Sequence, residues 1–444
     1  MIATATCPED APAAADLPAP VPALPKDLPP SDGPSSDGRP SDGAPRPRLL
    51  ACQHSVYESI REVDASEWNS VRIASEDPFM DPGFIEAVEN SMGNVCRFRH
   101  VIFRDKSGRP LAAACLSSYT VDGAALAEGS AKKILAAIGR VAPRLLRNTM
   151  VMCGLPISTG DSHLRFAPDA DRASVLAILD RLMVEFGKSE WARFLIFKEF
   201  DAGNSRDLQG LAELGYRRAD SYPMNYAAND YRDFEDYLSR LKSKRRTMLR
   251  RSMRRFAEGG LRVVTLTGRQ GAADIYTDKV HRLYEAVLAR SPVQFEYLPA
   301  EFFRELARRM PDNAVFSFVY AGEEIVAFEA SVESGSTFHG VVLGIDYELN
   351  KKYELYFNLL YRAVDRTLRR GARHILLGQT ADTTKHAKLD IYQGPMSIYV
   401  KGAKRTIRVA LALAFPLFFP PRPAAYLPEA DKETAAKIKE PRTQ

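Results

Sequence analysis

The chain has 444 residues, 45% of them hydrophobic, and a formal net charge of +5. This length exceeds that of one ordinary domain, and the apolar content is enough for two cores of typical size. The five cysteines are scattered and form neither a Cys-x-x-Cys pair nor a zinc-spaced cluster with histidine. This argues against a disulfide framework and a bound metal, and it favours a reducing compartment.

The first 48 residues are rich in Pro, Ala, Ser, Asp and Gly and repeat a Ser-Asp-Gly unit. Such a composition cannot bury enough apolar surface to offset chain entropy, so residues 1–48 are predicted to be a disordered tail. The tail lacks the basic and apolar regions of a secretory signal. The longest apolar stretch, Val409–Phe419, falls short of the roughly 20 residues that span a bilayer. We expect a cytoplasmic protein, either free or peripheral at the inner face of the membrane.

The first globular half is predicted to span residues 49–228. Its local patterns predict alternating helices and strands. The predicted elements are a helix over 83–90, a hairpin of strands 97–103 and 110–119, an insertion over 120–148, a helix over 171–188, a strand over 192–197, a short helix over 208–215 and a strand over 216–226.

The second half, predicted over 229–420, repeats this order and is followed by a tail over 421–444. The hairpin and the helix–strand segment of each half align in pattern, which indicates a duplicated domain. The predicted elements are strand 261–266, helices 273–290 and 299–310, strands 315–320, 325–333 and 336–345, helix 353–370 and strands 374–378 and 396–401.

A basic helix joins the two halves. Between Arg240 and Arg255 there are nine Lys and Arg residues and no acid. A solvated helix normally interleaves acids that pair at i,i+4, so this run favours an anionic partner such as phosphates, tRNA, an acidic carrier protein or lipid headgroups. The alternative is pairing with acids from elsewhere in the fold. The candidates for donor binding are Lys244, Arg246 and Arg250.

The order of elements over 261–401 and two short segments resemble one known family. The joining helix contains Ser243-Lys244-Arg245-Arg246, and Gly378-Gln379-Thr380 is followed by Lys385 or Lys388 and by Gly394-Pro395. This combination is similar to the Fem-like family of tandem-GNAT proteins, of the peptidoglycan- and cellulose-biosynthesis acetyltransferase type. The resemblance implies an α/β (α+β) fold of two tandem GNAT-like domains, with mixed central sheets flanked by helices.

The resemblance also implies an N-acyltransferase whose second half acts on a small-molecule amine. A typical GNAT carries a glycine-rich loop before its long helix, and the amides of that loop hold the pyrophosphate of acetyl-CoA. Here the equivalent stretch, Asp346–Tyr353, has no glycine. The donor therefore stays open between acyl-CoA, an acyl-carrier-protein thioester and aminoacyl-tRNA. We expect it to act as a co-substrate, with no permanently bound cofactor.

Acyl transfer to an amine needs a base, a donor to the carbonyl oxygen and an acid for the leaving group. Glu329 lies in an otherwise apolar strand, where burial would raise its pKa toward that of a usable base. Its alternative is a place on the polar face of the strand. Leu343 and Gly344 match the GNAT strand whose backbone N–H meets the carbonyl oxygen, although Gly344 can equally be a plain strand glycine.

The remaining candidates flank the next strand and the long helix. His339 titrates near neutrality and Asp346 can hold an acceptor amine, while Tyr356 can protonate a leaving thiolate. A surface histidine and a packing tyrosine are the alternatives. By resemblance, Lys385 or Lys388 meets the donor phosphate or the acceptor carboxylate, and the alternative is a solvated lysine.

Two other classes of function stay open. One is a non-catalytic double-GNAT module that holds nucleic acid or a membrane through the basic helix, and the other is an accessory protein of envelope polysaccharide biosynthesis. The amphipathic insertion over 132–147 and the run over 411–419 are candidate membrane contacts. The insertion can equally be a lid over the cleft.

Overall fold

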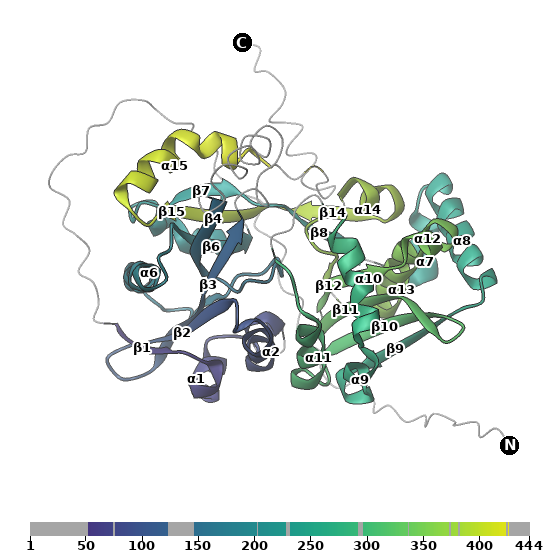
Figure 1. Cartoon of the computed structure of the whole chain (residues 1–444), viewed down its shortest axis with the longest axis horizontal. Coiled ribbons are helices and arrows are strands. Elements are labelled where there is room, and N and C mark those ends of the chain that lie inside the picture. Colours follow the sequence, from purple (N-terminus) through teal and green to yellow (C-terminus); the bar gives the residue numbers. More distant parts are fainter. Residues whose placement is uncertain are drawn as a thin grey trace, which may run out of the picture. The chain divides into compact units, whose positions relative to one another are not determined.

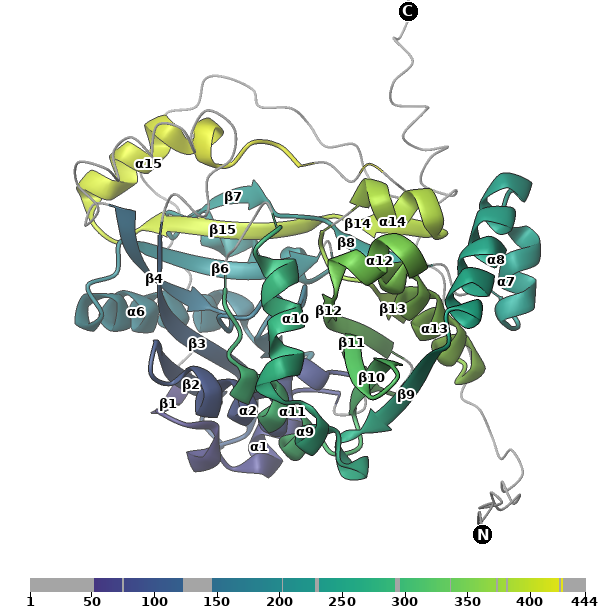
Figure 2. The same ribbon diagram turned by 45° about the vertical axis from the view of Figure 1, so that its right-hand side comes forward.

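The computed structural model describes residues 52–73, 76–122, 146–201, 203–227, 231–291, 296–335, 337–372, 374–380, 382–422 and 425. The predicted tail over 1–48, almost all of the amphipathic insertion and residues 426–444 lie outside this description. Within it, two mixed sheets are flanked by helices, as Figure 1 and Figure 2 show. The predicted fold class is therefore confirmed.

The first sheet has eight strands, and its central pair is parallel. The predicted hairpin is present as β2 and β3, which pair antiparallel, and β4 and β6 run parallel. The order is β1 (Gln53–Tyr57), β2 (Cys96–Arg104), β3 (Pro110–Asp122), β4 (Arg147–Cys153), β6 (Phe194–Asp201), β15 (Met396–Gly402) and β7 (Arg217–Asp220), with β5 (Leu164–Phe166) beside β3.

Helices cover this sheet. The longest is α6 (Arg172–Ser189), whose N-cap Asp171 accepts from the Ser174 amide as its sequence predicts. Its apolar side packs on β4 and β6 in a core that includes Leu179, Met183 and Phe197. The others are α1 (Ala65–Ser70), α2 (Pro82–Met92) and the 3-10 helices η1 (Ile60–Glu62), η2 (Pro78–Met80) and η3 (Asn204–Leu211).

The second sheet has seven strands, and again one pair, β12 and β13, is parallel. That pairing covers only Thr337–His339 of β12, after which β12 continues without β13. The order is β14 (Ile391–Gly394), β8 (Met224–Ala227), β13 (His374–Leu376), β12 (Thr337–Ile345), β11 (Glu324–Ser334), β10 (Ala314–Ala321) and β9 (Leu261–Thr267).

Two groups of helices lie on opposite faces of the second sheet. One group is α9 (Ala272–Ile275), α10 (Asp278–Leu288) and α11 (Ala300–Arg309), which follow η4 (Gly268–Gln270). The other is α7 (Phe234–Arg240), α8 (Ser243–Glu258), α12 (Tyr347–Tyr353), α13 (Leu355–Arg369) and α14 (Asp382–Lys388). The last helix, α15 (Arg405–Phe418), instead packs on β15 of the first sheet.

The two sheets exchange strands. Residues 216–226 are not one strand as predicted, because β7 lies in the first sheet and β8 in the second, with Ser221–Pro223 crossing between them. The chain crosses back between β14 and β15. Buried Lys401 on β15 then donates to both carboxylate oxygens of Asp180 on α6, at 2.7 and 2.8 Å. The chain therefore has no single position at which one half ends and the other begins.

The halves also share a core. Helices α2 and α11 pack against each other, and one cluster of buried side chains runs from Phe84 on α2 to Phe302 on α11. Asn90 donates across this contact to Glu305 at 2.5 Å. Among the described residues, no helix is both long and apolar enough to cross a membrane.

Candidate active site at the junction of the two sheets

The parallel strands β4 and β6 part at their carboxyl ends. β4 stops at Cys153 and leads into a loop over residues 154–163, while β6 continues to Asp201 against β15. The β6–β15 register shifts beside Glu199, whose φ of 60° lies in the left-handed region. Carboxyl ends of parallel strands are where α/β sheets place ligands, and such strain in a non-glycine residue often marks a functional site.

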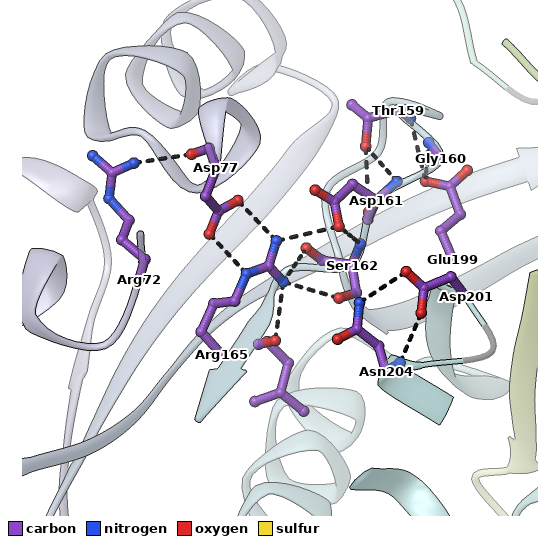
Figure 3. Close-up of polar contacts among 11 residues, drawn as sticks. Arg72, Asp77, Thr159, Gly160, Asp161, Ser162, Arg165, Glu199, Asp201 and Asn204 are labelled. Carbon is purple, nitrogen blue, oxygen red and sulfur yellow. Dashed lines mark hydrogen bonds and ion pairs between the residues drawn. The ribbon is translucent and has the colours of Figure 1, made fainter. Parts of the chain in front are cut away.

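Glu199 is buried, with 3% of its surface exposed. Its Oε2 accepts from the backbone N–H groups of Thr159 and Gly160, at 3.2 and 3.1 Å (Figure 3). The pKa of Glu199 is raised to about 7: burial has the largest effect and nearby Glu296 adds to it, while Lys198 and the two N–H donors oppose the shift. A carboxylate with this pKa exchanges protons near neutral pH.

Lys198 holds the loop that covers Glu199. Its Nζ donates to the carbonyl oxygens of Leu155 and Ile157 and lies 3.8 Å from Glu199 Oε1. The left-handed backbone at Glu199 lets these two consecutive side chains meet, which a regular strand would direct to opposite faces. A Cβ on Gly154 would come within 3.2 Å of the Lys198 side chain, so glycine permits this approach.

The second half supplies another carboxylate. Glu296 accepts from the amide and hydroxyl of Ser158, at 2.9 and 3.2 Å, and burial raises its pKa. Three successive backbone N–H groups, of Ser158, Thr159 and Gly160, therefore point at two carboxylates from different halves. Such a run of amides forms an anion-binding nest. We call Lys198, Glu199, Glu296 and the 158–160 backbone the junction cluster.

The predicted Gly378-Gln379-Thr380 segment lies beside this cluster. A Cβ on Gly160 would overlap Met224 Cε and lie 3.9 Å from the side chain of Gln379, which itself donates to the Tyr222 carbonyl at 3.0 Å. Buried Lys385 donates to the carbonyls of Leu377 and Thr380, at 2.5 and 2.6 Å. Lys385 thus shapes the turn next to the site.

An ion-pair network ties the loop to η2. Arg165 donates to Asp77 at 2.7 and 2.8 Å and to Asp161 at 3.2 Å, and Arg72 donates to the Asp77 carbonyl at 2.9 Å (Figure 3). Burial raises the pKa of Asp77 against the opposing effect of Arg165. Asp161 adjoins Gly160, so the network fixes the loop end that carries the Glu199 donors.

Glu329, the predicted base, lies under α13. Arg366 donates to its Oε2 at 3.2 Å and to Glu333 at 2.8 Å, while Oε1 is buried and has no hydrogen-bond partner among the described residues. Glu329 faces Leu343 across β11 and β12. Glu329 therefore lies one strand away from the part of β12 that continues without β13. The contacts of Glu329 hold α13 on the sheet.

His339 is buried on the opposite face of the same sheet, where its ring meets Phe79 edge to face at 4.7 Å. Neither ring nitrogen has a hydrogen-bond partner among the described residues, and burial lowers the pKa to about 3. The structure therefore does not bring His339 and Glu329 together. A histidine that stays neutral at physiological pH in an apolar setting fits packing better than proton transfer.

Gly344 lies at a close approach, and the group that approaches it is part of the protein. A Cβ there would lie 2.8 Å from the Tyr284 amide of α10 and 2.2 Å from the Phe328 ring. Leu343 faces α13 and shares an apolar cluster with Tyr356. Burial raises the pKa of Tyr356. The β11–β12 register shifts between Ala330 and Ser331, so β12 carries a bulge next to its free edge.

The stretch without glycine forms a helix, α12, instead of a phosphate loop. Asp346 caps it by accepting from the amides of Glu348 and Leu349. The next helix, α13, begins at Glu354 in a left-handed conformation, and Lys388 donates to the Glu354 carboxylate at 3.1 Å. The end of α13 that faces phosphates in an ordinary GNAT therefore carries an acid of its own.

The basic helix is α8, and its three candidate residues have different surroundings. Lys244 is exposed, Arg246 donates to the Ser239 and Leu241 carbonyls at the end of α7, and Arg250 pairs with exposed Glu235 at 3.2 Å. The other ion pair recorded for α8 among the described residues joins Arg254 to Glu258. Acids from elsewhere in the described fold thus balance few of its charges.

Sequence reasoning missed the junction cluster. The predicted strand stops at Phe197, one residue before Lys198-Glu199. The available signal was a Lys-Glu pair inside an apolar strand, between Phe197 and Phe200. Two adjacent charges cannot both face solvent from a buried strand, so the pair marks an irregular backbone.

Comparison with known proteins identifies the family. A family model described as FemAB-like, peptidoglycan biosynthesis/recognition, matches residues 150–382, which is more than half of the chain. The chain belongs to the FemAB-like family. The match begins within β4 and ends within α14, so it includes the junction cluster, α8 and α13. No curated protein matches this FemAB-like chain in sequence.

Several solved structures resemble this FemAB-like protein. FemX aligns with a TM-score of 0.47 at 11% identity, over 78% of this chain and 96% of FemX. A tandem GNAT protein of the clavulanic acid pathway aligns with a TM-score of 0.44 at 10% identity, over 80% and 99% of the two chains. L-PGS from Bacillus licheniformis gives 0.42 at 12% identity, over 75% and 96%.

Proposed function

We propose that this FemAB-like protein is a transferase that moves an acyl or aminoacyl group from a carrier to an amine of a peptidoglycan precursor. The observation that carries the proposal is Glu199, a buried carboxylate with a pKa of about 7 at the carboxyl end of two parallel strands. A general base works best when its pKa lies near the operating pH. Family membership supports the precursor as acceptor.

In this proposal Glu199 takes a proton from the acceptor ammonium, and the free amine attacks the donor carbonyl. The new C–N bond forms as the bond from carbonyl carbon to the carrier sulfur or oxygen breaks. The proton on Glu199 then passes to the leaving thiolate or alkoxide. The second proton, which the attacking nitrogen loses as the amide forms, passes to water, so the base ends each cycle unchanged.

The donor is best explained by a carrier other than free CoA. Glu354 and its partner Lys388 occupy the start of α13, where a carboxylate repels an incoming diphosphate. The exposed charges of α8 instead suit an extended anionic carrier, either aminoacyl-tRNA or an acidic acyl-carrier protein.

The proposal is tested by mixing the full chain with a UDP-linked muramyl pentapeptide and one labelled donor at a time. The donors are aminoacyl-tRNA, acyl-carrier-protein thioesters and acetyl-CoA. We expect label on the peptide amine with a carrier-bound donor, and loss of roughly 100-fold or more in rate for Glu199→Gln. Transfer from acetyl-CoA alone would overturn the donor proposal. Full activity of Glu199→Gln would show that Glu199 is not the base.

A second candidate function is non-catalytic binding of nucleic acid through α8. The exposed, largely unbalanced cations of this helix favour it. Titration of tRNA at increasing salt separates the two ideas. A steep salt dependence that Lys244→Glu and Arg250→Glu weaken, without any labelled product, would support the binding module alone.

A further inference from the structure

The last helix, α15, presents an apolar face to solvent. Val409, Leu413 and Leu417 recur at i, i+4 and i+8, which places them in one stripe along the helix. Val409 is 56% exposed and Leu413 81% exposed, and Leu417 and Phe418 are exposed as well. Single exposed leucines are ordinary on a protein surface, whereas a contiguous stripe of this kind marks an interaction surface.

The opposite face of α15 is already used. Leu411 is buried against the first sheet, and Phe415 lies under the guanidinium of Arg217 on β7, 5.5 Å from it. Gly402 lets the helix approach closely, because a Cβ there would lie 2.6 Å from the Arg408 amide. Both ribbon views show α15 lying along β15 and β7 (Figures 1 and 2). The exposed stripe therefore faces away from the fold on a helix that is fixed to it.

Charge distinguishes this stripe from a general hydrophobic patch. Lys404, Arg405 and Arg408 are exposed at the start of the helix, and α15 contains no acidic residue. Arg405 lies four residues before Val409 and so heads the same stripe. A helix face on which a cation precedes a run of apolar side chains matches the boundary between anionic headgroups and acyl chains. A second protein surface would need acids to match the cations and an apolar groove to match the stripe.

We propose that α15 rests in the plane of an anionic membrane surface, with Val409, Leu413 and Leu417 among the acyl chains and Arg405 among the headgroups. The 14 residues and internal Pro416 suit a helix that lies on the bilayer. This surface is on the first sheet and uses no residue of the junction cluster. It would hold the protein next to membrane-bound substrates independently of the transfer reaction.

The test is co-sedimentation of the full chain with phosphatidylcholine vesicles, with and without phosphatidylglycerol. We expect binding that needs the anionic lipid and weakens about tenfold or more in the double variant Leu413→Ser with Leu417→Ser. Replacing Arg405 with Glu should weaken it about fivefold and make the remainder less sensitive to salt. Ile73→Ser is the matched control, because Ile73 is also exposed, at 65%, and lies outside α15. Circular dichroism checks that each variant is folded.

Depth of insertion gives a second readout. The variant Leu413→Trp should show a blue-shifted fluorescence with anionic vesicles and quenching by brominated acyl chains. Equal binding of the double serine variant and the wild type would overturn the proposal. So would a stable dimer in sedimentation velocity that the same substitutions dissociate, since α15 would then be covered by a second copy of the chain.

Discussion

Glu199 in the first sheet and Glu329 in the second are both buried glutamates on a strand of a GNAT-like half, yet their surroundings differ. The partners of Glu199 are two backbone N–H groups, with a lysine at 3.8 Å that is committed to loop carbonyls. The partner of Glu329 is the guanidinium of Arg366, which also binds Glu333. One carboxylate has a pKa near 7, and the other is neutralised by a full positive charge.

The comparison shows two different roles that a buried carboxylate can have. An arginine on a covering helix pairs with a carboxylate and fixes the helix on the sheet, which is a structural role. Neutral amide donors offset only part of the free-energy cost of burying the charge. The pKa is therefore raised, and the carboxyl group can gain and lose a proton near neutral pH. Sequence composition alone favours Glu329, because it lies alone in an apolar strand. The contacts favour Glu199.

The largest effect should come from exchanging the two glutamates for glutamine. We expect Glu199→Gln to lower the transfer rate by roughly 100-fold or more, because a general base contributes that much. Glu329→Gln should leave the rate within about threefold, since its carboxylate acts on α13 and not on substrate. Steady-state rates with the same labelled donor measure both. Comparable losses in the two variants would return the base to the second half.

Arg366→Met should destabilise the fold without a matching loss of rate per folded molecule. It leaves buried Glu329 without its cation, whereas Glu333 keeps its pair with Arg370, and breaking a buried pair in this way costs about 3–5 kcal/mol. Urea unfolding measures the change. Arg369→Met is the control, because its pair with Asp365 lies on the exposed side of the same helix and its loss should be too small to measure. Equal effects of the two substitutions would contradict a buried anchor.

The pH dependence of stability should follow Glu199. Its pKa is 4.5 when unfolded and about 7 when folded, so between these values the folded state keeps a proton that the unfolded state has lost. The contribution is therefore fully present below pH 4.5 and disappears as the pH rises through 7, at about 3 kcal/mol in all. Denaturation at a series of pH values should show this slope, and Glu199→Gln should flatten it. The rate should rise as the pH passes through about 7, where Glu199 loses its proton in the folded protein.

The smallest effect should come from Gly160→Ala. A Cβ at this φ of 73° is strained and would overlap Met224, so the loop must shift. We expect a stability loss of about 1–3 kcal/mol and a higher pKa of Glu199, because one of the N–H donors that lower this pKa moves away. Gly108→Ala has the same backbone strain with open space around it, which separates strain from displacement of the loop. Identical rate effects in both variants would show that the donor geometry is irrelevant.

Much of the fold could be predicted because it is local. The β2–β3 hairpin follows from a turn between two apolar strands, and α6 from Asp171 and its apolar periodicity. The family resemblance rested on the α8 segment and on Gly378–Thr380, which the structure places beside Gly160. What local pattern could not provide was the partner of each strand. Pro223 marks a break within residues 216–226, but nothing in this segment assigns its two ends to different sheets.

The site was harder because it depends on one backbone angle and on contacts between distant segments. Leu343 and Tyr356 do share a cluster, and Gly344 does sit at a close approach, but α10 and α13 fill those places. Glu199 becomes unusual only through its left-handed backbone and through Glu296, which is far along the chain. No window of sequence contains both.

The exchange of β8 and β15 also has a consequence for biosynthesis. β15 lies between β6 and β7, so the first sheet receives an inner strand from residues 396–402. Synthesis must pass residue 402 before that sheet can close, and until then β6 and β7 have exposed edges that favour mispairing. The nascent chain therefore cannot complete the first sheet before the second half is synthesised. Truncation just before Met396 would leave that sheet without an inner strand, although its other strands had already been synthesised.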